Sequence, residues 1–235
     1  MENTKKAVIG YFIGLLLIIG LFFYIGIDKV ASALSQFQII YLVPAVILFL
    51  AVLCLNALNL KIMYMPVANI PYLTLLKKYA VSWSLGTILP SRAGEFSLAY
   101  FLKDRVPIGK STAILALDKL VSLAVFSFFS ILGMLYFFGF REAFQLFLVL
   151  AVLGFLLFFS LWSEKIRGLI KKTVLARVKH HFTGFSKTFR EYLKNEKKII
   201  FANFCFTLMR LFLQAALLLF LFAGFGATVN LFILI

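Results

Sequence analysis

The stretch TILPSRAGEFSLAYFL, residues 87–102, decides the arrangement of the chain because it interrupts an otherwise apolar sequence. A proline, an arginine, a glycine and a glutamate fall between Pro90 and Glu95. The segment 79–102 is broken here into two arms, and neither arm crosses a bilayer alone, since a helix rises only about 1.5 Å per residue. The stretch is therefore either a loop exposed to water or a polar hairpin held inside a membrane.

The composition of the whole chain is typical of a polytopic membrane protein. It has 235 residues, 63% of them hydrophobic, and a mean hydropathy of +1.02, whereas soluble domains are about half apolar. Several apolar runs approach the roughly 20 residues that a helix needs to span a bilayer. They predict membrane spans at 7–25, 41–60, 112–138, 143–162 and 199–222. We predict an all-α transmembrane helix bundle that forms one transmembrane domain over residues 1–235, with the first run retained rather than cleaved as a signal peptide.

The distribution of Lys and Arg distinguishes between the two paths for 79–102, because these residues collect on the cytoplasmic side of membrane proteins. If 79–102 crosses once, the basic residues of 103–110 and 163–198 fall outside the cell. If it dips in and returns, nineteen of the 24 Lys and Arg lie inside and two, Lys29 and Arg141, lie outside. This asymmetry favours a re-entrant helical hairpin and a cytoplasmic N-terminus in the cell membrane. Irregular backbone at membrane depth must be covered by protein or line a cavity, so we expect the hairpin tip inside the bundle.

A basic amphipathic segment follows the fourth predicted span. Apolar residues recur at helical steps at Ile166, Leu169, Ile170, Val174, Val178, Phe182, Phe185, Phe189 and Leu193, with Lys and Arg between many of them. We predict one or two helices over 164–195, broken at Gly184, that lie on the inner membrane surface and attract anionic lipid headgroups. This surface accounts for much of the net charge of +15, so we expect no nucleic-acid partner. A shorter amphipathic piece, Val30 to Phe37, is expected on the outer surface.

Five ionisable residues lie within the apolar segments: Arg92, Glu95, Asp118, Lys119 and Arg210. Each costs about 2.5–3.5 kcal/mol on insertion scales, so each is a functional candidate. Arg92 and Glu95 are three residues apart and can pair on a helix. Asp118 and Lys119 point in different directions on their helix, so we expect them to pair with other segments rather than with each other.

The set contains three bases and two acids, so one positive charge remains if both acids pair. A surplus of cations suits the phosphate of a lipid headgroup, which Arg92 and Arg210 can bind bidentately and Lys119 as a point charge. Gly94 allows backbone N–H groups to approach the same anion. Glu95 and Asp118 are expected to orient the basic side chains. Gln214 lies one turn from Arg210 on the same face.

A purely structural role stands beside this interpretation. Arg92 and Glu95 can act as a clamp that closes the hairpin, with Asp118 and Lys119 as counter-charges, and Arg210 can bind a helix C-terminus. Polar residues elsewhere in the spans are expected to form hydrogen bonds between helices rather than to bind ligands. They are Asn56, Asn59, Tyr79, Ser82, Ser84 and Asn203.

The sequence offers little for catalysis, and we expect no cofactor and no metal. His180 and His181 are adjacent and make a poor chelate, because they point about 100° apart on a helix. Cys54 and Cys205 lie in apolar runs and form no metal-binding or disulfide pattern. No Ser–His–Asp set, phosphate-binding glycine loop or acidic pair for a nucleotide-sugar metal is present. Glu95 or Asp118 remains a possible base, as in glycosyltransferases that act on lipids.

The hairpin and the helix after it resemble a known family. Pro90, Arg92, Gly94 and Glu95, an apolar helix, the segment Lys103 to Gly109 and then Asp118–Lys119 resemble the transmembrane region of lysylphosphatidylglycerol synthetase, a flippase-like family of bacterial and archaeal membrane proteins. The family usually has Glu–Arg at the pair and a further Asp three residues on, where this chain has Asp–Lys and Ser122. The family's second half has its own Pro/Gly-rich turn, whereas this chain stops in a new apolar run, NLFILI at 230–235, so we expect a longer natural protein.

The resemblance implies movement of an anionic phospholipid or a polyprenyl-linked lipid between leaflets. A second interpretation is the membrane part of an enzyme system, either a phosphatidylglycerol lysyltransferase, in which this region is joined to a soluble transferase domain, or a lipid glycosyltransferase. Such a system implies a partner transferase. A third interpretation is a scaffold without a substrate, in which the buried charges only pair with each other. An oligomer is compatible with each of these interpretations.

Overall fold

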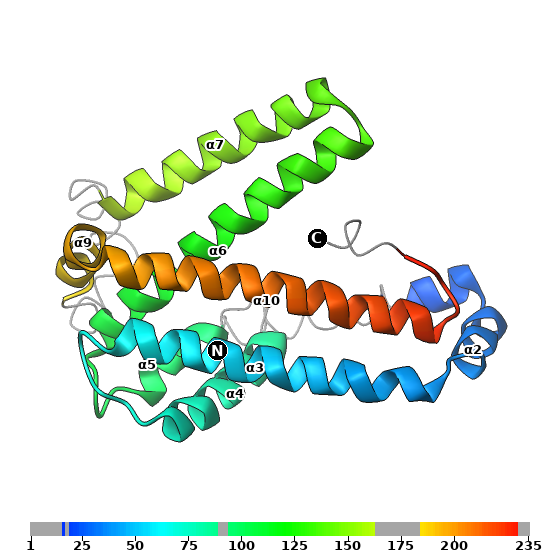
Figure 1. The fold of residues 1–235 in the computed structure, drawn as a ribbon, viewed down its shortest axis with the longest axis horizontal. Helices are drawn as coiled ribbons and strands as arrows, with labels where there is room; N and C mark the ends of the chain where they lie inside the picture. Colours follow the sequence, from blue (N-terminus) through cyan, green and yellow to red (C-terminus); the bar gives the residue numbers. More distant parts are fainter. Residues whose placement is uncertain (1–15, 17–18, 89–93, 163–183, 230–235) are drawn as a thin grey trace.

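The computed structural model describes residues 16, 19–88, 94–162 and 184–229, and in these residues the chain is all-α, without strands (Figure 1). The helices in chain order are α2 (Ile27–Ser35), a 3-10 turn (Ile39–Tyr41), α3 (Leu42–Tyr64), α4 (Tyr72–Ile88), α5 (Ser97–Phe101), α6 (Ile108–Phe137), α7 (Phe140–Trp162), α9 (Phe185–Asn195) and α10 (Lys197–Gly224). The predicted all-α helix bundle is confirmed in these residues.

α3 and α10 form the long axis of the molecule and run antiparallel, side by side (Figure 1). At one end the N–H of Gln38 donates to the carbonyl of Gly224 at 2.8 Å. The ring of Phe37 meets that of Phe225 there, with 4.8 Å between centroids. α2 lies at the same end. We call it the far end, because the core and most of the charged residues lie at the opposite one.

The core lies where the C-terminal end of α3 meets α4, α5, α9 and the start of α6. Its largest fully buried side chains include Tyr64, Met63, Leu98, Ile114 and Phe189. Elsewhere the helices expose their apolar side chains, as expected of surfaces that face lipid rather than water. In the part of the chain that the structure describes, three helical stretches are long and apolar enough to cross a membrane: Ile39–Tyr64, Ile108–Phe137 and Lys197–Gly224.

The segment 79–102 doubles back on itself. Ser82 on α4 donates its hydroxyl to the carbonyls of Gly94 at 3.0 Å and Glu95 at 2.8 Å. Lys78 donates to the carbonyl of Phe101, so both ends of the segment lie together. The return arm is short, one 3-10 turn at 94–96 followed by α5. The folded-back path is a feature of the structure, whereas its depth in a membrane stays a prediction.

Glycine allows the two arms of this hairpin to touch. A Cβ atom placed on Gly94 would collide with the backbone of Leu85 and Gly86. A Cβ on Gly86 would lie 2.9 Å from Cγ of Glu95. The arms therefore meet backbone to backbone at Gly94, which no other residue type permits without displacement.

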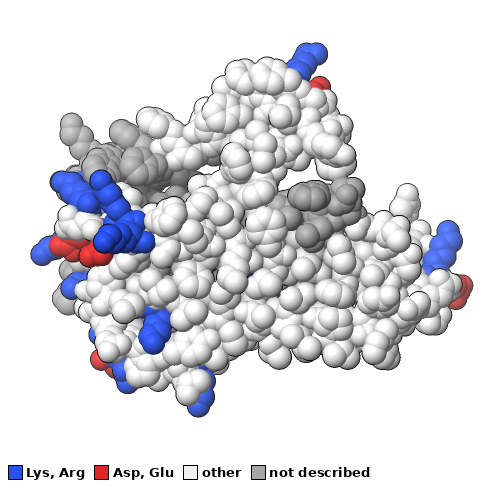
Figure 2. All heavy atoms as spheres, in the orientation of Figure 1, with Lys and Arg blue, Asp and Glu red and all other residues white. Residues whose placement is uncertain are grey.

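Charged side chains collect at the end where α4, α5 and α9 meet, which we call the basic end (Figure 2). Described Lys and Arg at this end belong to the ends of α3, α4, α5 and α6, to α9 and to the start of α10: Lys61, Lys77, Lys78, Lys103, Arg105, Lys110, Lys187, Arg190, Lys194, Lys197 and Lys198. The middle of the molecule is uncharged on the face shown. Lys29 on α2 and Arg141 at the start of α7 lie away from this end.

α9 is the described part of the predicted basic amphipathic segment, and the rest of that segment, 163–183, lies outside the described residues. Gly184 precedes α9 with φ +89°, a conformation that suits glycine and separates α9 from what comes before. Phe189 and Tyr192 on its apolar face are buried against the ends of α3 and α6. The apolar face of α9 is therefore covered by protein at these positions, while Lys187 points outward and is 82% exposed.

Candidate functional site

A chain of polar residues, all buried except the part-buried Asn56, connects α3, α6 and α10 in the apolar part of the bundle. We call it the polar cluster, and its members are Asn56, Asn59, Asp118, Ser122, Asn203, Thr207 and Arg210. Helical spacing produces it: on each helix the members are three or four residues apart and so share one face. Because hydrogen bonds link all three helices, the cluster fixes how they pack.

Asp118 is the acceptor at one end of the cluster and is only 5% exposed. Its Oδ1 accepts from Nδ2 of Asn59 on α3 at 3.0 Å and from Nδ2 of Asn203 on α10 at 3.1 Å. Two amide donors from neighbouring helices thus replace the water that a carboxylate would have outside the membrane. Asp118 thus bonds two other helices, as predicted, but it is also within ion-pair distance of its neighbour Lys119, which was not predicted.

Lys119 connects α6 to the hairpin through an ion pair with Glu95, whose side chain is 8% exposed. Its Nζ is also 3.8 Å from Oδ2 of Asp118, a longer contact. The free volume beside these three residues is about 10 Å³, which holds roughly one water molecule. The Glu95–Lys119 pair therefore holds the hairpin against α6 and leaves no space there for a headgroup.

Arg210 lies at the other end of the cluster and is 9% exposed. Its Nη1 donates to Oδ1 of Asn56 and its Nη2 to the hydroxyl of Ser122, both at 2.8 Å. The ring of Phe126 lies 5.9 Å from the guanidinium carbon. The Nε–H is buried and has no acceptor. Among the described residues no carboxylate forms an ion pair with Arg210, so its charge is met by neutral oxygens and the Phe126 ring rather than by an acid.

The predicted site residues that the structure describes fall into two groups, which Ser122 connects. Lys119, Glu95 and Asp118 meet near the hairpin, and Arg210 lies one helical turn further along, joined to Asp118 through Ser122, which donates to the Asp118 carbonyl at 2.8 Å. Gly94 contributes close backbone packing and a carbonyl acceptor for Ser82. Arg92 lies outside the described residues, so its pairing with Glu95 stays a prediction.

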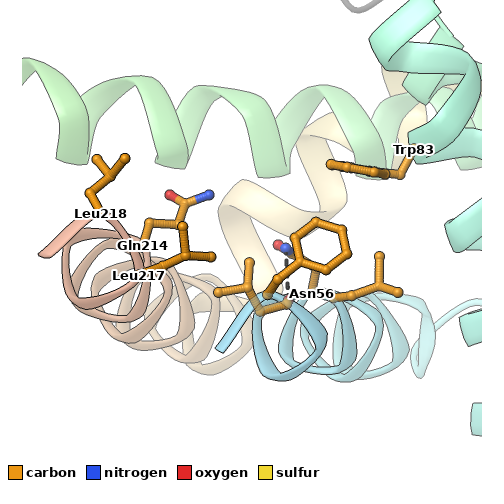
Figure 3. Close-up of a pocket in the computed structure, with 8 residues that line it drawn as sticks. Asn56, Trp83, Gln214, Leu217 and Leu218 are labelled. Carbon is orange, nitrogen blue, oxygen red and sulfur yellow. Dashed lines mark hydrogen bonds between the residues drawn. The ribbon is translucent and has the colours of Figure 1, made fainter. Parts of the chain in front are cut away.

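A groove opens beside Arg210 between α3, α10 and α4 (Figure 3). Its volume is about 340 Å³, and most of its wall is apolar, from Phe49, Val52, Leu53, Leu217 and Leu218. Trp83 of α4 closes one side and meets Phe49 edge to face at 5.3 Å. Asn56 and Gln214 are its polar residues, and Asn56 forms the floor between the groove and Arg210.

Sequence reasoning singled out the charged residues and named Asn56, Asn59 and Asn203 as interhelical hydrogen-bonding groups, which they are. It missed Thr207, which bonds Asn203 at 3.4 Å, and the place of Trp83 in the groove. The spacing of Asn203, Thr207 and Arg210 along one face of α10 was a usable signal for Thr207. No described group of three His, Cys, Asp or Glu could hold a metal ion.

The comparisons with known proteins bear on this arrangement. The chain matches the family described as lysylphosphatidylglycerol synthase TM region over residues 11–235. Searches of the curated proteins and of the solved structures give no significant match. The match covers nearly the whole chain, confirms the resemblance inferred from the hairpin motif, and agrees with three helical stretches long enough to cross a bilayer. This chain therefore belongs to the lysylphosphatidylglycerol synthase TM region family and is an integral membrane protein.

Proposed function

We propose that this protein binds the phosphate-bearing head of an anionic lipid at Arg210 and moves that lipid between the two leaflets. The observation that carries the proposal is a buried arginine with one unsatisfied N–H and no described carboxylate partner. Arg210 is about 18 Å from Lys198 and about 21 Å from Gly224 along α10, at about 1.5 Å per residue. It therefore lies near the middle of a helix long enough to cross the membrane.

Energetics support a ligand for this cation. A lone charge near the bilayer centre is costly, and residues that persist there line substrate or ion pathways. Neutral oxygens from Asn56 and Ser122 satisfy part of its donor set but supply no counter-charge. A lipid phosphate would supply both the charge and a bidentate acceptor.

In this proposal the two carboxylates of the site hold neighbouring side chains in place and do not bind the lipid. Glu95 holds Lys119, and Asp118 holds the amides of Asn59 and Asn203, so both carboxylates have partners without the lipid. Arg92, which lies outside the described residues, is proposed from the sequence as a second phosphate contact. Lys119 can also contact the phosphate, but only if its ion pair with Glu95 breaks.

A second function is favoured by the family description, which names a synthase. Under it the chain is the membrane part of a phosphatidylglycerol lysyltransferase system, and a partner transferase supplies the chemistry. Phosphatidylglycerol is itself an anionic phospholipid, so the same Arg210 site would serve both functions. Loss of lysylphosphatidylglycerol from cells that lack this chain, restored by its return, would favour the second function.

The proposed function is tested in proteoliposomes that carry fluorescent phosphatidylglycerol, with dithionite quenching the outer leaflet. Wild-type protein is expected to expose the inner-leaflet lipid faster than empty liposomes. Arg210→Gln is expected to reduce this rate to the background. The matched control is Lys187→Gln, a basic residue that is 82% exposed on α9 and is expected to behave as wild type. Equal rates for Arg210→Gln and wild type would contradict the site, and a wild-type rate equal to empty liposomes would contradict lipid movement.

A further inference from the structure

The floor of the groove beside Arg210 is formed by one polar side chain with two distinct hydrogen bonds. Asn56 donates its Nδ2 to the carbonyl of Val52 at 3.0 Å and accepts from Arg210 Nη1 on Oδ1 at 2.8 Å. The backbone bond within α3 holds the amide in one orientation. Its oxygen is thus kept on the guanidinium, where an anionic oxygen would lie in an arginine–phosphate pair.

The groove itself has the chemistry of a place for one acyl chain. Its walls are apolar, Phe49 and Leu218 are 37% and 42% exposed, and it lies along helices that expose apolar surface to the membrane. A second groove of about 450 Å³ lies between α6 and α7, but no charged residue lines it. The α3–α10 groove, by contrast, has apolar walls and a polar floor residue, Asn56, that is hydrogen-bonded to the buried Arg210.

We propose that an anionic phospholipid docks laterally in the α3–α10 groove, with one acyl chain against Phe49, Trp83 and Leu218. Its phosphate displaces the Asn56 side chain from Arg210. Asn56 is then a neutral placeholder: it satisfies Arg210 in the empty site and yields to a charged oxygen. This inference rests on the proposed function, because it names where the lipid of that function binds.

The charge on position 56 makes the placeholder role testable. An acid there would pair with Arg210 permanently and repel the phosphate, so Asn56→Asp is expected to melt no lower than wild type but to lose preference for anionic lipid. Asn56→Ala frees Arg210 and is expected to keep the preference. A purely structural amide predicts the reverse order, with Asn56→Ala the more damaged protein and Asn56→Asp harmless to lipid binding.

The chain has two tryptophans, Trp83 and Trp162, and this permits a direct measurement of acyl-chain contact. In a Trp162→Phe background Trp83 is the only tryptophan, and brominated acyl chains quench it on contact. We expect brominated phosphatidylglycerol to quench more than brominated phosphatidylcholine at equal mole fraction, with competition by plain phosphatidylglycerol but not by inorganic phosphate. The preference should fall about tenfold or more in Asn56→Asp and in Arg210→Gln, since each removes a charge-assisted contact.

The matched control adds Arg141→Gln to the Trp162→Phe background. Arg141 is an exposed basic residue at the start of α7 and does not line the groove, so this variant is expected to keep the preference reported by Trp83. Equal quenching of Trp83 by the two brominated lipids would overturn the proposal. So would retention of the preference in Asn56→Asp, or its loss in Asn56→Ala. Lipid movement that persists in proteoliposomes without this preference would overturn the docking groove and leave the proposed function standing. A preference without movement would support the groove and count against the proposed function.

Discussion

Gly94 determines, at the scale of one residue, whether the segment 79–102 can fold back. The atoms that a new Cβ would meet there belong to the backbone of α4, at Leu85 and Gly86, and cannot rotate away as a side chain would. We expect Gly94→Ala to lower the free energy of unfolding by about 1–3 kcal/mol, the usual cost of overpacking. This corresponds to a few degrees in melting temperature for a chain of this size. The measurement is thermal unfolding in detergent.

Gly133 on α6 provides the control for this substitution. A Cβ there meets no heavy atom within 4 Å. Since alanine favours the helix over glycine by about 0.5–1 kcal/mol, Gly133→Ala is expected to melt at or above the wild-type temperature. Equal melting temperatures for the two alanine variants would show that the close approach of Gly94 to α4 does not hold the hairpin.

Sequence predicted the charged residues of the site better than their partners, for a physical reason. Charged residues inside apolar runs are rare because their transfer into a membrane is costly. Glu95, Asp118, Lys119 and Arg210 could therefore be identified from the sequence. Which residue pairs with each charge depends on the rotation of each helix about its axis and on the distance between helix axes. Sequence periodicity determines neither of these. The pairing of Lys119 with Glu95 and the donation of Arg210 to Asn56 therefore came from the structure.

At the scale of the element, α9 shows what amphipathicity can and cannot predict. The alternation of apolar and basic residues predicted a helix with a basic outer face, and the structure has that helix. The same alternation does not say what covers the apolar face. Phe189 and Tyr192 pack on the bundle, and the Tyr192 hydroxyl donates to the carbonyl of Met63 at 2.5 Å. Burial raises the pKa of this hydroxyl, so it remains a donor beyond pH about 10, the ordinary tyrosine value.

The loss of stability caused by a substitution on α9 should increase with the burial of the side chain that is replaced. Phe189→Ala removes a fully buried ring and is expected to cost about 3–5 kcal/mol. Tyr192→Phe removes one hydrogen bond, at about 0.5–1.5 kcal/mol. Lys187→Ala, on the exposed face, is expected to change stability by less than about 0.5 kcal/mol. Hydrogen exchange of the α9 amides should be fastest in Phe189→Ala, slower in Tyr192→Phe and slowest in Lys187→Ala. Equal exchange rates in Tyr192→Phe and Lys187→Ala would contradict the docking of α9 through Met63.

The helices themselves were the most predictable elements, because apolar length and membrane thickness leave few alternatives. Their ends were not, since capping and turns depend on local contacts. α6 starts at Ile108 rather than 112, and α4 starts at Tyr72, well before the hairpin segment inferred from 79 onward. The hairpin is consequently asymmetric, with one long arm and one short arm.

At the scale of the whole molecule, charge divides the bundle into two ends. Lys and Arg gather at the basic end (Figure 2). There Lys78 on α4 donates to the carbonyl of Phe101 on α5, so the hairpin ends at the same end of the molecule where it began. A hairpin of this kind puts residues 103–110 on the same side of the membrane as α9. The positive-inside rule predicts that this side faces the cytoplasm.

Cysteine labelling tests this orientation in intact cells. With Cys54 and Cys205 replaced by serine, since both are exposed, single cysteines are introduced as Asp104→Cys at the basic end and Arg141→Cys at the start of α7. An impermeant maleimide is expected to label Arg141→Cys in intact cells, and Asp104→Cys only after permeabilisation. The reason is that α6 crosses once between the two positions, so they face opposite solutions. Labelling of Asp104→Cys in intact cells would mean that 79–102 crosses the membrane, and the inward placement of the basic end would then be wrong.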